Sequence, residues 1–467
     1  MKLSVVVLAG GLGTRIKSET PKLLHKILNK TIIERTLDTA RALNPKEIVV
    51  VINPQLNAIQ DALANYDGLS FAIQQRPLGT ANALHSSLPS LSHNSDWLLI
   101  INGDTPLVSH QTLSGFIEMA VESMSKVSIL TFNARNPGDY GRIIRNGKQE
   151  VVSIVEKPDL TNESKHITEV NSGIYLLSRD VAPLVNEIPM NPKKGEYYLT
   201  DIVSVAVRKG MKVSAFCIGD EDELLGINTR QDLNRAISLL NTKKINALMS
   251  EGVTFIDISG VVIDSDVQIG MDTIVYPNVI IEGESVIGRG CIIYQGSYIN
   301  HSVLEEGVRI KPYSVIQQSR INKYAEIGPF AHIRPQSIIG ESVRIGNFVE
   351  VKKSHIGKGV KASHLSYIGD ADVGQGTNIG AGTITCNYDG VNKHKTIIED
   401  GVFIGSDTQL IAPVRIGKGA YVGAGSTITK DVPEGALAIS RTSQRNISDW
   451  AKKRHTKSIK GDHSDKA

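Results

Sequence analysis

An aliphatic residue stands at every sixth position over two long stretches in the second half of this chain. The positions are Ile263, Ile269, Val275, Ile281, Ile287, Ile293 and Ile299, and later Ile404, Leu410, Ile416, Val422 and Ile428. A period of six fits neither an α-helix nor an ordinary strand. It is typical of the hexapeptide repeat, in which short strands wind into a β-helix and each rung buries its aliphatic side chain against its neighbours. We therefore predict a left-handed parallel β-helix.

The corners and the breaks of the repeat carry further information. A corner closes only if a small residue follows four positions after the aliphatic one, as Ala420, Ser426 and Thr383 do. The rhythm slips near His301–Leu304, and again between Cys386 and Lys395, where eight residues, Asn-Tyr-Asp-Gly-Val-Asn-Lys-His, are inserted. An insertion in a repeat maps to a loop on one face, which is often the functional face.

The first half of the chain alternates apolar runs with segments of helical periodicity. We predict strands over Leu3–Ala9, Glu47–Ile52, Trp97–Ile101, Val127–Asn133 and Val151–Val155, and helices over Thr31–Leu43 and Thr112–Met124. This alternation predicts an α/β domain with a mostly parallel, Rossmann-like sheet. Such sheets bind ligands at the carboxyl ends of their strands.

A helical pattern separates the two halves. It begins at Thr229, an N-cap residue, and ends before Gly252. We predict three parts: a first domain over residues 1–228, a linker helix over 229–250, and a β-helix domain over 251–467. The last part ends in a basic, solvated tail that contains Lys452, Lys453, Arg454, Lys457 and Lys460.

Composition narrows the class of protein. At 467 residues the chain is too long for one core, and its net charge of +3 predicts binding to neither nucleic acid nor membranes. Cys217, Cys291 and Cys386 are odd in number and widely spaced, which predicts free thiols in a reducing cytoplasm.

A phosphate-binding pattern follows the first predicted strand. Gly10, Gly11 and Gly13 let the backbone approach an anion closely, although a glycine-rich turn without a ligand is about as common. Arg15 and Lys22 add cations for phosphate oxygens. The motif Asn102-Gly103-Asp104 ends the buried Trp97–Ile101 strand and offers a carboxylate for Mg²⁺ at the ligand edge.

Gly-x-Gly-Thr-Arg, then Pro-Lys, then Gly-Asp after a strand resembles the pattern of sugar-1-phosphate nucleotidyltransferases. Joined to a hexapeptide β-helix, the chain resembles the bacterial bifunctional uridylyltransferase/acetyltransferase family over roughly Leu3 to Arg441. The resemblance implies acetyl transfer from acetyl-CoA to glucosamine 1-phosphate. It also implies uridylyl transfer from UTP to N-acetylglucosamine 1-phosphate in a Mg²⁺-dependent site that releases pyrophosphate, and a homotrimer.

The resemblance also implies roles for residues of the first domain. The uridylyl site comprises Arg15 and Lys22 as catalytic cations, with substrate contacts from Leu8, Ala9, Gly10, Gly11, Gln74, Gly79, Thr80, Asn102, Gly103, Gly141, Glu156 and Asn171, and with Asp104 and Asn228 as Mg²⁺ ligands. The chain departs from the family in reading Leu-Ala-Gly-Gly where Leu-Ala-Ala-Gly is usual. Asn102 also stands where some members carry an aromatic residue.

The predicted β-helix carries polar residues that its core does not need. By resemblance, His364 is the general base that accepts the amine proton. The sugar phosphate is contacted by Arg334, Lys352, Tyr367, Asn378 and Lys393, and the coenzyme by Ala381, Asn387, Tyr388, Ser406, Ala424 and Arg441. For the small residues among them, closing a rung is the structural alternative.

Two other functions stay open on the sequence alone. One is a nucleotidyltransferase with a single activity, whose β-helix only assembles or regulates. The other is a non-catalytic assembly module that keeps an enzyme fold. The polar set His364, Asn387 and Lys393 favours the bifunctional enzyme, because a regulatory β-helix has no use for it.

Overall fold

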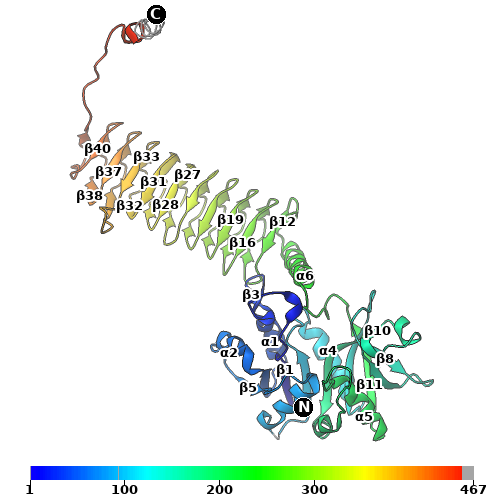
Figure 1. The fold of residues 1–467 in the computed structure, drawn as a ribbon. Helices are drawn as coiled ribbons and strands as arrows, with labels where there is room; N and C mark the ends of the chain where they lie inside the picture. Colours follow the sequence, from blue (N-terminus) through cyan, green and yellow to red (C-terminus); the bar gives the residue numbers. More distant parts are fainter. Residues whose placement is uncertain (1, 93, 455–467) are drawn as a thin grey trace, which may run out of the picture. The chain divides into compact units, whose positions relative to one another are not determined.

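The computed structural model describes residues 2–92 and 94–454, so Lys457 and Lys460 of the predicted tail lie outside the described residues. The chain separates into two compact units, residues 1–246 and 247–467. Figure 1 shows a helix-covered sheet in the first unit and a stack of short strands in the second.

The first unit is built on a nine-stranded sheet with the order β11-β7-β10-β6-β1-β4-β5, to which β8 and β9 are attached through β10. Its strands are β1 (Leu3–Leu8), β4 (Glu47–Ile52), β5 (Leu69–Ile73), β6 (Trp97–Asn102), β7 (Val127–Asn133), β8 (Arg142–Arg145), β9 (Val151–Val155), β10 (Glu169–Ser178) and β11 (Val213–Gly219), and β2 (Lys26–Ile27) and β3 (Lys30–Thr31) form a separate hairpin. Strand β1 runs parallel to β4 and β6, whereas β10 is antiparallel to β6 and β7. The α/β prediction is confirmed.

Helices cover both faces of this sheet. They are α1 (Ile32–Ala42), α2 (Asn57–Ala62), α3 (Thr80–Ser87), α4 (His110–Glu122) and α5 (Ile202–Arg208), and α6 (Arg230–Ser250) follows them. Helix α1 starts with a capping box, in which Thr31 Oγ1 accepts from the Glu34 N–H and Glu34 Oε2 accepts from the Thr31 N–H. Thr229 and Asp232 form the same reciprocal pair before α6.

Both faces of β1 are buried, which explains why five of its six residues are apolar. Val5 and Val7 pack into the core beneath α1 and α4, and Val6 packs into the opposite core beneath α3 and α5.

The second unit is a left-handed parallel β-helix, as predicted. Its first face contains β12 (Thr254–Phe255), β15 (Ile274–Val275), β18 (Ile292–Ile293), β21 (Arg309–Ile310), β24 (Glu326–Ile327), β27 (Arg344–Asn347), β30 (Lys361–His364), β33 (Asn378–Ile379), β36 (Phe403–Ile404), β39 (Tyr421–Val422) and β41 (Leu437–Ala438). Its second face contains β13 (Val262–Ile263), β16 (Ile280–Glu282), β19 (Tyr298–Asn300), β22 (Val315–Gln317), β25 (His332–Ile333), β28 (Glu350–Lys352), β31 (Tyr367–Gly369), β34 (Ile384–Cys386), β37 (Gln409–Ile411) and β40 (Thr427–Ile428). Its third face contains β14 (Gln268–Ile269), β17 (Val286–Ile287), β20 (Val303–Leu304), β23 (Arg320–Ile321), β26 (Ile338–Ile339), β29 (His355–Ile356), β32 (Ala371–Val373), β35 (Thr396–Ile398) and β38 (Val414–Ile416).

The predicted aliphatic ladder fills the prism. All twelve of its members are buried, from Ile263 to Ile428. The small residues Ala420, Ser426 and Thr383 are buried at the corners, as the repeat requires. The ladder makes each coil the packing partner of the next, so side chains on the outside are free to serve other purposes.

One corner column between the first and second faces carries large residues in a left-handed backbone conformation. Tyr313, Phe330 and Phe348 have φ values of 57°, 52° and 56°, and their rings stack at centroid distances of 5.3 and 5.5 Å. About half of each side chain is exposed. Leu365 continues this column on the next coil, where its N–H donates to the Asn347 carbonyl.

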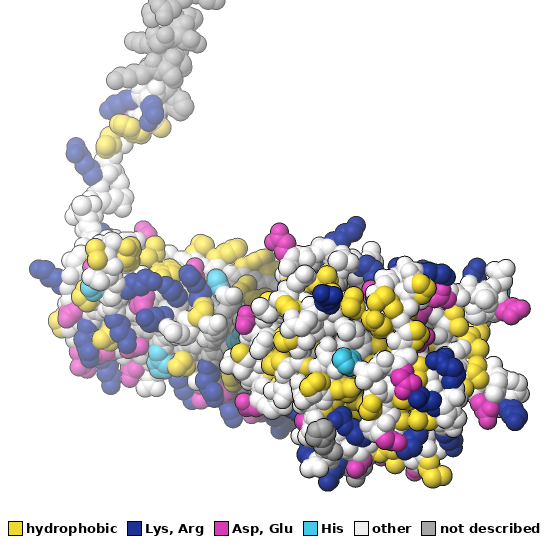
Figure 2. Space-filling view, turned by 60° about the horizontal axis from the view of Figure 1, so that its bottom comes forward, with side chains coloured by type: hydrophobic (Ala, Val, Ile, Leu, Met, Phe, Trp, Pro, Cys, Tyr) yellow, Lys and Arg dark blue, Asp and Glu magenta, His cyan; other side chains and the backbone are white. Residues whose placement is uncertain are grey.

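The inserted segment leaves the prism between β34 and β35, at the predicted place. Its ends are closed by an isolated bridge between Tyr388 and Lys393, and the His394 N–H donates to the Asn387 carbonyl. On the surface that Figure 2 shows, basic and acidic side chains are interspersed, as the small net charge leads one to expect.

Candidate functional site

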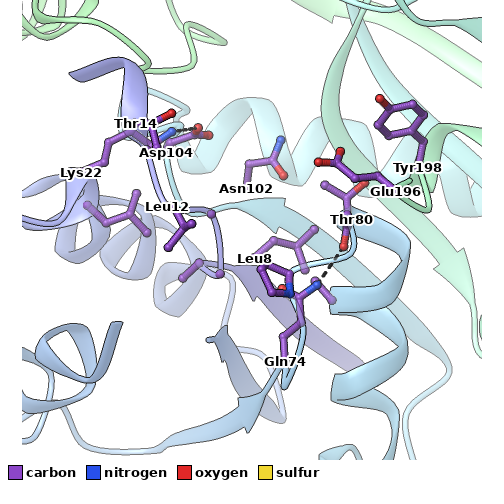
Figure 3. Close-up of a pocket in the computed structure, with 18 residues that line it drawn as sticks. Leu8, Leu12, Thr14, Lys22, Gln74, Thr80, Asn102, Asp104, Glu196 and Tyr198 are labelled. Carbon is purple, nitrogen blue, oxygen red and sulfur yellow. Dashed lines mark hydrogen bonds and ion pairs between the residues drawn. The ribbon is translucent and has the colours of Figure 1, made fainter. Parts of the chain in front are cut away.

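A cavity of about 520 Å³ lies at the carboxyl ends of β1 and β6 in the first unit (Figure 3). Ten of the predicted site residues line it: Leu8, Ala9, Gly10, Gly11, Lys22, Gln74, Gly79, Thr80, Asn102 and Asp104. The topology therefore brings the glycine-rich turn, the Pro-Lys motif and the Gly-Asp motif to one edge of the sheet, where an α/β sheet binds its ligands.

A cluster of opposite charges forms one end of this cavity. Lys22 Nζ lies 2.5 Å from Asp104 Oδ2 and 3.3 Å from Asn228 Oδ1, and the Lys22 side chain is only 10% exposed. Arg15 Nη2 donates to the same Asn228 oxygen at 2.9 Å, and Arg15 Nη1 lies 3.4 Å from Asp139 Oδ2. Two side chains far apart in the sequence, Asp104 and Asn228, thus direct their oxygens at one cation.

This donor set fits Mg²⁺. An ammonium group already occupies the position between the Asp104 carboxylate and the Asn228 amide oxygen, so the two side chains form a place for positive charge. In the described residues no group of three or more His, Cys, Asp or Glu side chains could hold a metal ion. One carboxylate and one amide suit Mg²⁺, because this ion takes its remaining ligands from water and substrate phosphates.

Gln74 forms the other end of the cavity and is held rigidly. Its Nε2 donates to the Gly79 carbonyl at 3.0 Å and to Asn82 Oδ1 at 2.9 Å. A Cβ at Gly10 would lie 2.6 Å from Gln74 Oε1. Gly10, which departs from the family motif, therefore lies directly against Gln74, one of the predicted substrate contacts.

A second group of predicted residues comprises Gly141 just before β8, Glu156 just after β9 and Asn171 on β10. The Asn171 N–H donates to the Gly141 carbonyl at 2.9 Å, and Asn171 Nδ2 donates to the Tyr175 hydroxyl at 2.8 Å. Burial raises the pKa of Glu156. Gly173 on β10 lies against Asn102, which lines the cavity. A Cβ at Gly173 would lie 2.1 Å from Asn102 Nδ2, so a glycine is needed for this contact.

Glu196 and Tyr198 also line the cavity, and the sequence analysis missed both (Figure 3). They follow a loop, and no strand or helix pattern there predicts that they reach the carboxyl edge. The short motif Gly-Glu-Tyr-Tyr was the available signal, because two aromatic residues beside a carboxylate are unusual on an exposed loop.

In the second unit, His364 heads a column of small residues on the first face. His364, Ala381, Ser406 and Ala424 each stand two positions beyond residues paired in register on β30, β33, β36 and β39. Arg441 turns back onto this column, where its guanidinium donates to the Ala424 carbonyl. His364 Nδ1 lies 2.7 Å from Asn347 Oδ1 on the preceding coil.

A second cluster gathers on the second face around Lys352 and Tyr367. Lys393 of the inserted loop lies beside Lys352, whose ammonium lowers the pKa of Lys393. Asn387 Nδ2 donates to Asp370 Oδ2 at 2.5 Å and lies 3.5 Å from the Tyr367 hydroxyl. Two adjacent ammonium groups favour an anion between them.

Arg334 adjoins the same cluster through strand pairing, and its Nη1 lies 2.7 Å from Glu350 Oε1. Asn378 lies on the first face, paired with Lys361, and Tyr388 is exposed with its hydroxyl donating to the Gly390 carbonyl. Among the described residues, no hydrogen bond or ion pair joins the His364 side chain to the Lys352 cluster. The His364 column and the Lys352 cluster thus lie on different faces of one chain.

Comparisons with known proteins assign different families to the two units of the chain. Residues 4–223 match the Nucleotidyl transferase family, residues 258–345 the GMPPB C-terminal domain, and residues 395–430 the Bacterial transferase hexapeptide (six repeats) family.

Curated relatives span almost the whole chain. A Bifunctional protein GlmU of Thermodesulfovibrio yellowstonii is 54% identical over 452 residues, which cover 97% of this chain and 99% of the relative. Proteins of the same name from Carboxydothermus hydrogenoformans and Clostridium novyi are each 44% identical, and cover 96% and 98% of this chain and 99% and 100% of their own lengths. Over residues 2–92 and 94–454, no helix has the length and apolar character needed to cross a membrane.

Proposed function

The chain belongs to the bifunctional GlmU family, and we propose that the two residue groups described above carry its two reactions. The protein is a transferase with a nucleotidyltransferase activity and an acetyltransferase activity. UTP is the uridylyl donor and acetyl-CoA the acetyl donor. The reactions together yield UDP-N-acetylglucosamine from glucosamine 1-phosphate.

The observation that carries the uridylyl assignment is the placement of Lys22 between Asp104 and Asn228 at the carboxyl edge of the sheet. N-acetylglucosamine 1-phosphate is already an anionic nucleophile, so its phosphate oxygen attacks the α-phosphorus of UTP without a general base, and pyrophosphate leaves. Lys22 and Arg15 neutralise phosphate charge, and Gln74, fixed by Gly79 and Asn82, orients the base. Catalysis is then positioning and charge neutralisation.

Asp104 and Asn228 would hold the Mg²⁺ of this site. When bound, the ion supplies positive charge to the phosphates of the nucleotide. The Lys22 ammonium contacts the same two oxygens in this structure. With the ion bound, this flexible side chain would turn toward a phosphate oxygen.

The acetyl site uses the His364 column and the Lys352 cluster. His364 takes a proton from the amine of glucosamine 1-phosphate, and the amine nitrogen attacks the thioester carbon of acetyl-CoA. The amide forms as the C–S bond breaks, and CoA leaves as a thiolate that receives the proton from His364. Lys352, Lys393 and Arg334 attract the sugar phosphate. Ala381, Ser406 and Ala424 leave an open strip along the prism for the coenzyme.

These two groups would meet between subunits of a homotrimer. They lie on different faces of one chain, so the first face of one subunit can adjoin the second face of the next. The exposed column of Tyr313, Phe330, Phe348 and Leu365 lies at the edge shared by these faces and supports such packing. A cytoplasmic location is supported by the three free thiols of Cys217, Cys291 and Cys386.

Two variants of the full-length chain test the assignment. His364→Ala should lower acetyl transfer by ~10²–10⁴-fold, the usual contribution of general-base catalysis, and leave uridylyl transfer unchanged. Asp104→Ala should lower uridylyl transfer and leave acetyl transfer unchanged. Equal loss of both activities in either variant, or no loss, would contradict the assignment, and circular dichroism checks folding.

A further inference from the structure

The pairing of β27 with β30 extends further than its neighbours on the same face. The β24–β27 and β30–β33 pairs each comprise two residue pairs, whereas β27 and β30 have a third, which joins Asn347 to His364. Gly346 permits this, because a Cβ there would lie 1.8 Å from the Ser363 carbonyl oxygen. The chain thus draws two coils together at the one place where an amide faces the predicted base.

The contact favours one tautomer of His364. Asn347 Oδ1 lies 2.7 Å from His364 Nδ1. An amide oxygen only accepts, so this contact is a hydrogen bond when Nδ1 carries the proton, and in that tautomer of the neutral ring the lone pair lies on Nε2. The backbone of His364 is also fixed, since Ser366 Oγ donates to the His364 carbonyl at 2.8 Å.

We propose that Asn347 is a positioning residue for acetyl transfer, which holds His364 in the Nδ1–H tautomer and presents Nε2 to the amine of the substrate. The proposal rests on the general-base role of His364 given above. An amide suits this task better than a carboxylate, because it orients the ring without adding the negative charge that favours imidazolium. The charged residues on the adjacent strands of the first face are Arg344 on β27 and Lys361 on β30, and β33 has none. These three strands carry no carboxylate, so none of them places a negative charge beside the His364 ring that would favour imidazolium.

Two substitutions separate tautomer control from general packing. Asn347→Leu keeps the size but removes the acceptor. It should lower kcat for acetyl transfer roughly 10- to 100-fold, as loss of an orienting partner does for other histidines, and leave KM for both substrates nearly unchanged. Asn347→Asp keeps the acceptor and adds a charge. It should retain acetyl transfer at alkaline pH and move the acid limb of the pH–rate profile to higher pH.

A double variant tests whether Asn347 acts through His364. Asn347→Leu combined with His364→Ala should be no slower than His364→Ala alone, because residues that act as a unit are not additive. Gln317→Leu is the matched control, since it removes an amide 3.1 Å from His332 Nε2 on the second face and should leave the pH profile of acetyl transfer in place. Uridylyl transfer should be unchanged in every variant.

The outcomes are distinguishable. If His364→Ala keeps acetyl transfer, the proposed catalytic role of His364 fails. If His364→Ala loses it but Asn347→Leu keeps the full kcat, the positioning role of Asn347 alone is overturned. The role is equally overturned if Asn347→Leu raises KM at unchanged kcat, or if Asn347→Asp leaves the acid limb in place.

Discussion

Lys22 Nζ and Asp104 Oδ2 lie 2.5 Å apart, although the two residues are 82 positions apart in the chain. The pair is largely buried, with side-chain exposures of 10% and 22%. The ammonium and the carboxylate therefore form an ion pair in a place that a phosphate and a divalent cation are expected to share. Substrate binding must rearrange this pair.

Removal of the divalent cation is the first prediction. Chelation by EDTA should abolish UDP-sugar formation and leave acetyl transfer intact, because only the uridylyl site has the Asp104–Asn228 donor set. Asp104→Asn should weaken Mn²⁺ binding, measured by electron paramagnetic resonance, at least about 10-fold, since even outer-shell partners of a metal contribute that much.

Asp180→Asn is the control for this experiment. Asp180 is exposed, and its carboxylate lies 2.8 Å from Lys126 Nζ. Neither residue lines the cavity. Its replacement should leave Mn²⁺ binding unchanged. Unaltered Mn²⁺ affinity in Asp104→Asn would contradict the metal assignment.

The pH dependence of sugar-phosphate binding is the second prediction. The ammonium of Lys352 lowers the pKa of Lys393, so Lys393 is charged below this lowered pKa and loses its charge as pH rises through it. KM for glucosamine 1-phosphate in acetyl transfer should therefore rise on the alkaline side. In Lys393→Arg the rise should move to higher pH, because a guanidinium stays protonated.

Steady-state measurements of acetyl transfer between neutral and alkaline pH check this, with uridylyl transfer on the same samples as the reference. An identical alkaline rise in Lys393→Arg and the unsubstituted enzyme would show that Lys393 does not bind the phosphate.

The third prediction concerns how much buried side chains stabilise the prism. Strand β26 offers a matched pair of residues, one buried and one exposed. Ile339 is fully buried inside the prism, at a position equivalent to those of the ladder, whereas its neighbour Ile338 is 43% exposed. Ile339→Ala should destabilise the second unit by about 2–5 kcal/mol, the usual loss for a buried aliphatic side chain. Ile338→Ala should change stability by no more than about 0.5 kcal/mol.

Amide hydrogen exchange of the coils around β26 measures this effect locally, and the strands of the first unit serve as the internal reference. Similar exchange in both variants would mean that the ladder does not carry the stability of the prism.

Complementation between subunits is the fourth prediction. His364→Ala and Lys352→Ala chains should each be inactive in acetyl transfer, yet their co-expression should restore activity. Random assortment leaves roughly a quarter of the sites with both groups intact if each site takes one face from each of two subunits. Only residual activity in the mixture would place both groups in the same chain, and sedimentation of an active monomer would refute the trimer.

Much of this architecture could be predicted because it depends on local periodicity. The ladder from Ile263 to Ile428 follows from a six-residue repeat, and strands such as Glu47–Ile52 follow from apolar runs between turns. The meeting of Lys22 with Asp104 could be anticipated from the rule that parallel strands present ligands at their carboxyl ends.

Other contacts depend on information that periodicity lacks. The pairing of Asn347 with His364 depends on coil lengths and on the close approach at Gly346. The amide of Asn387 is held by Asp370 on the preceding coil, a contact across the base of the inserted loop that the repeat does not dictate. Glu196 and Tyr198 reach the cavity from a loop whose path no repeat dictates.

The insertion between β34 and β35 has a consequence for how such a chain can evolve. Ile356 pairs with Val373 after 17 positions, and Val373 pairs with Ile398 after 25, yet the ladder continues through both coils without a shift. The corner therefore accepts additional length without disturbing the strands on either side. Residues that make the prism fold and residues that give it chemistry can vary separately, so a new activity at this corner requires a new loop and no new scaffold.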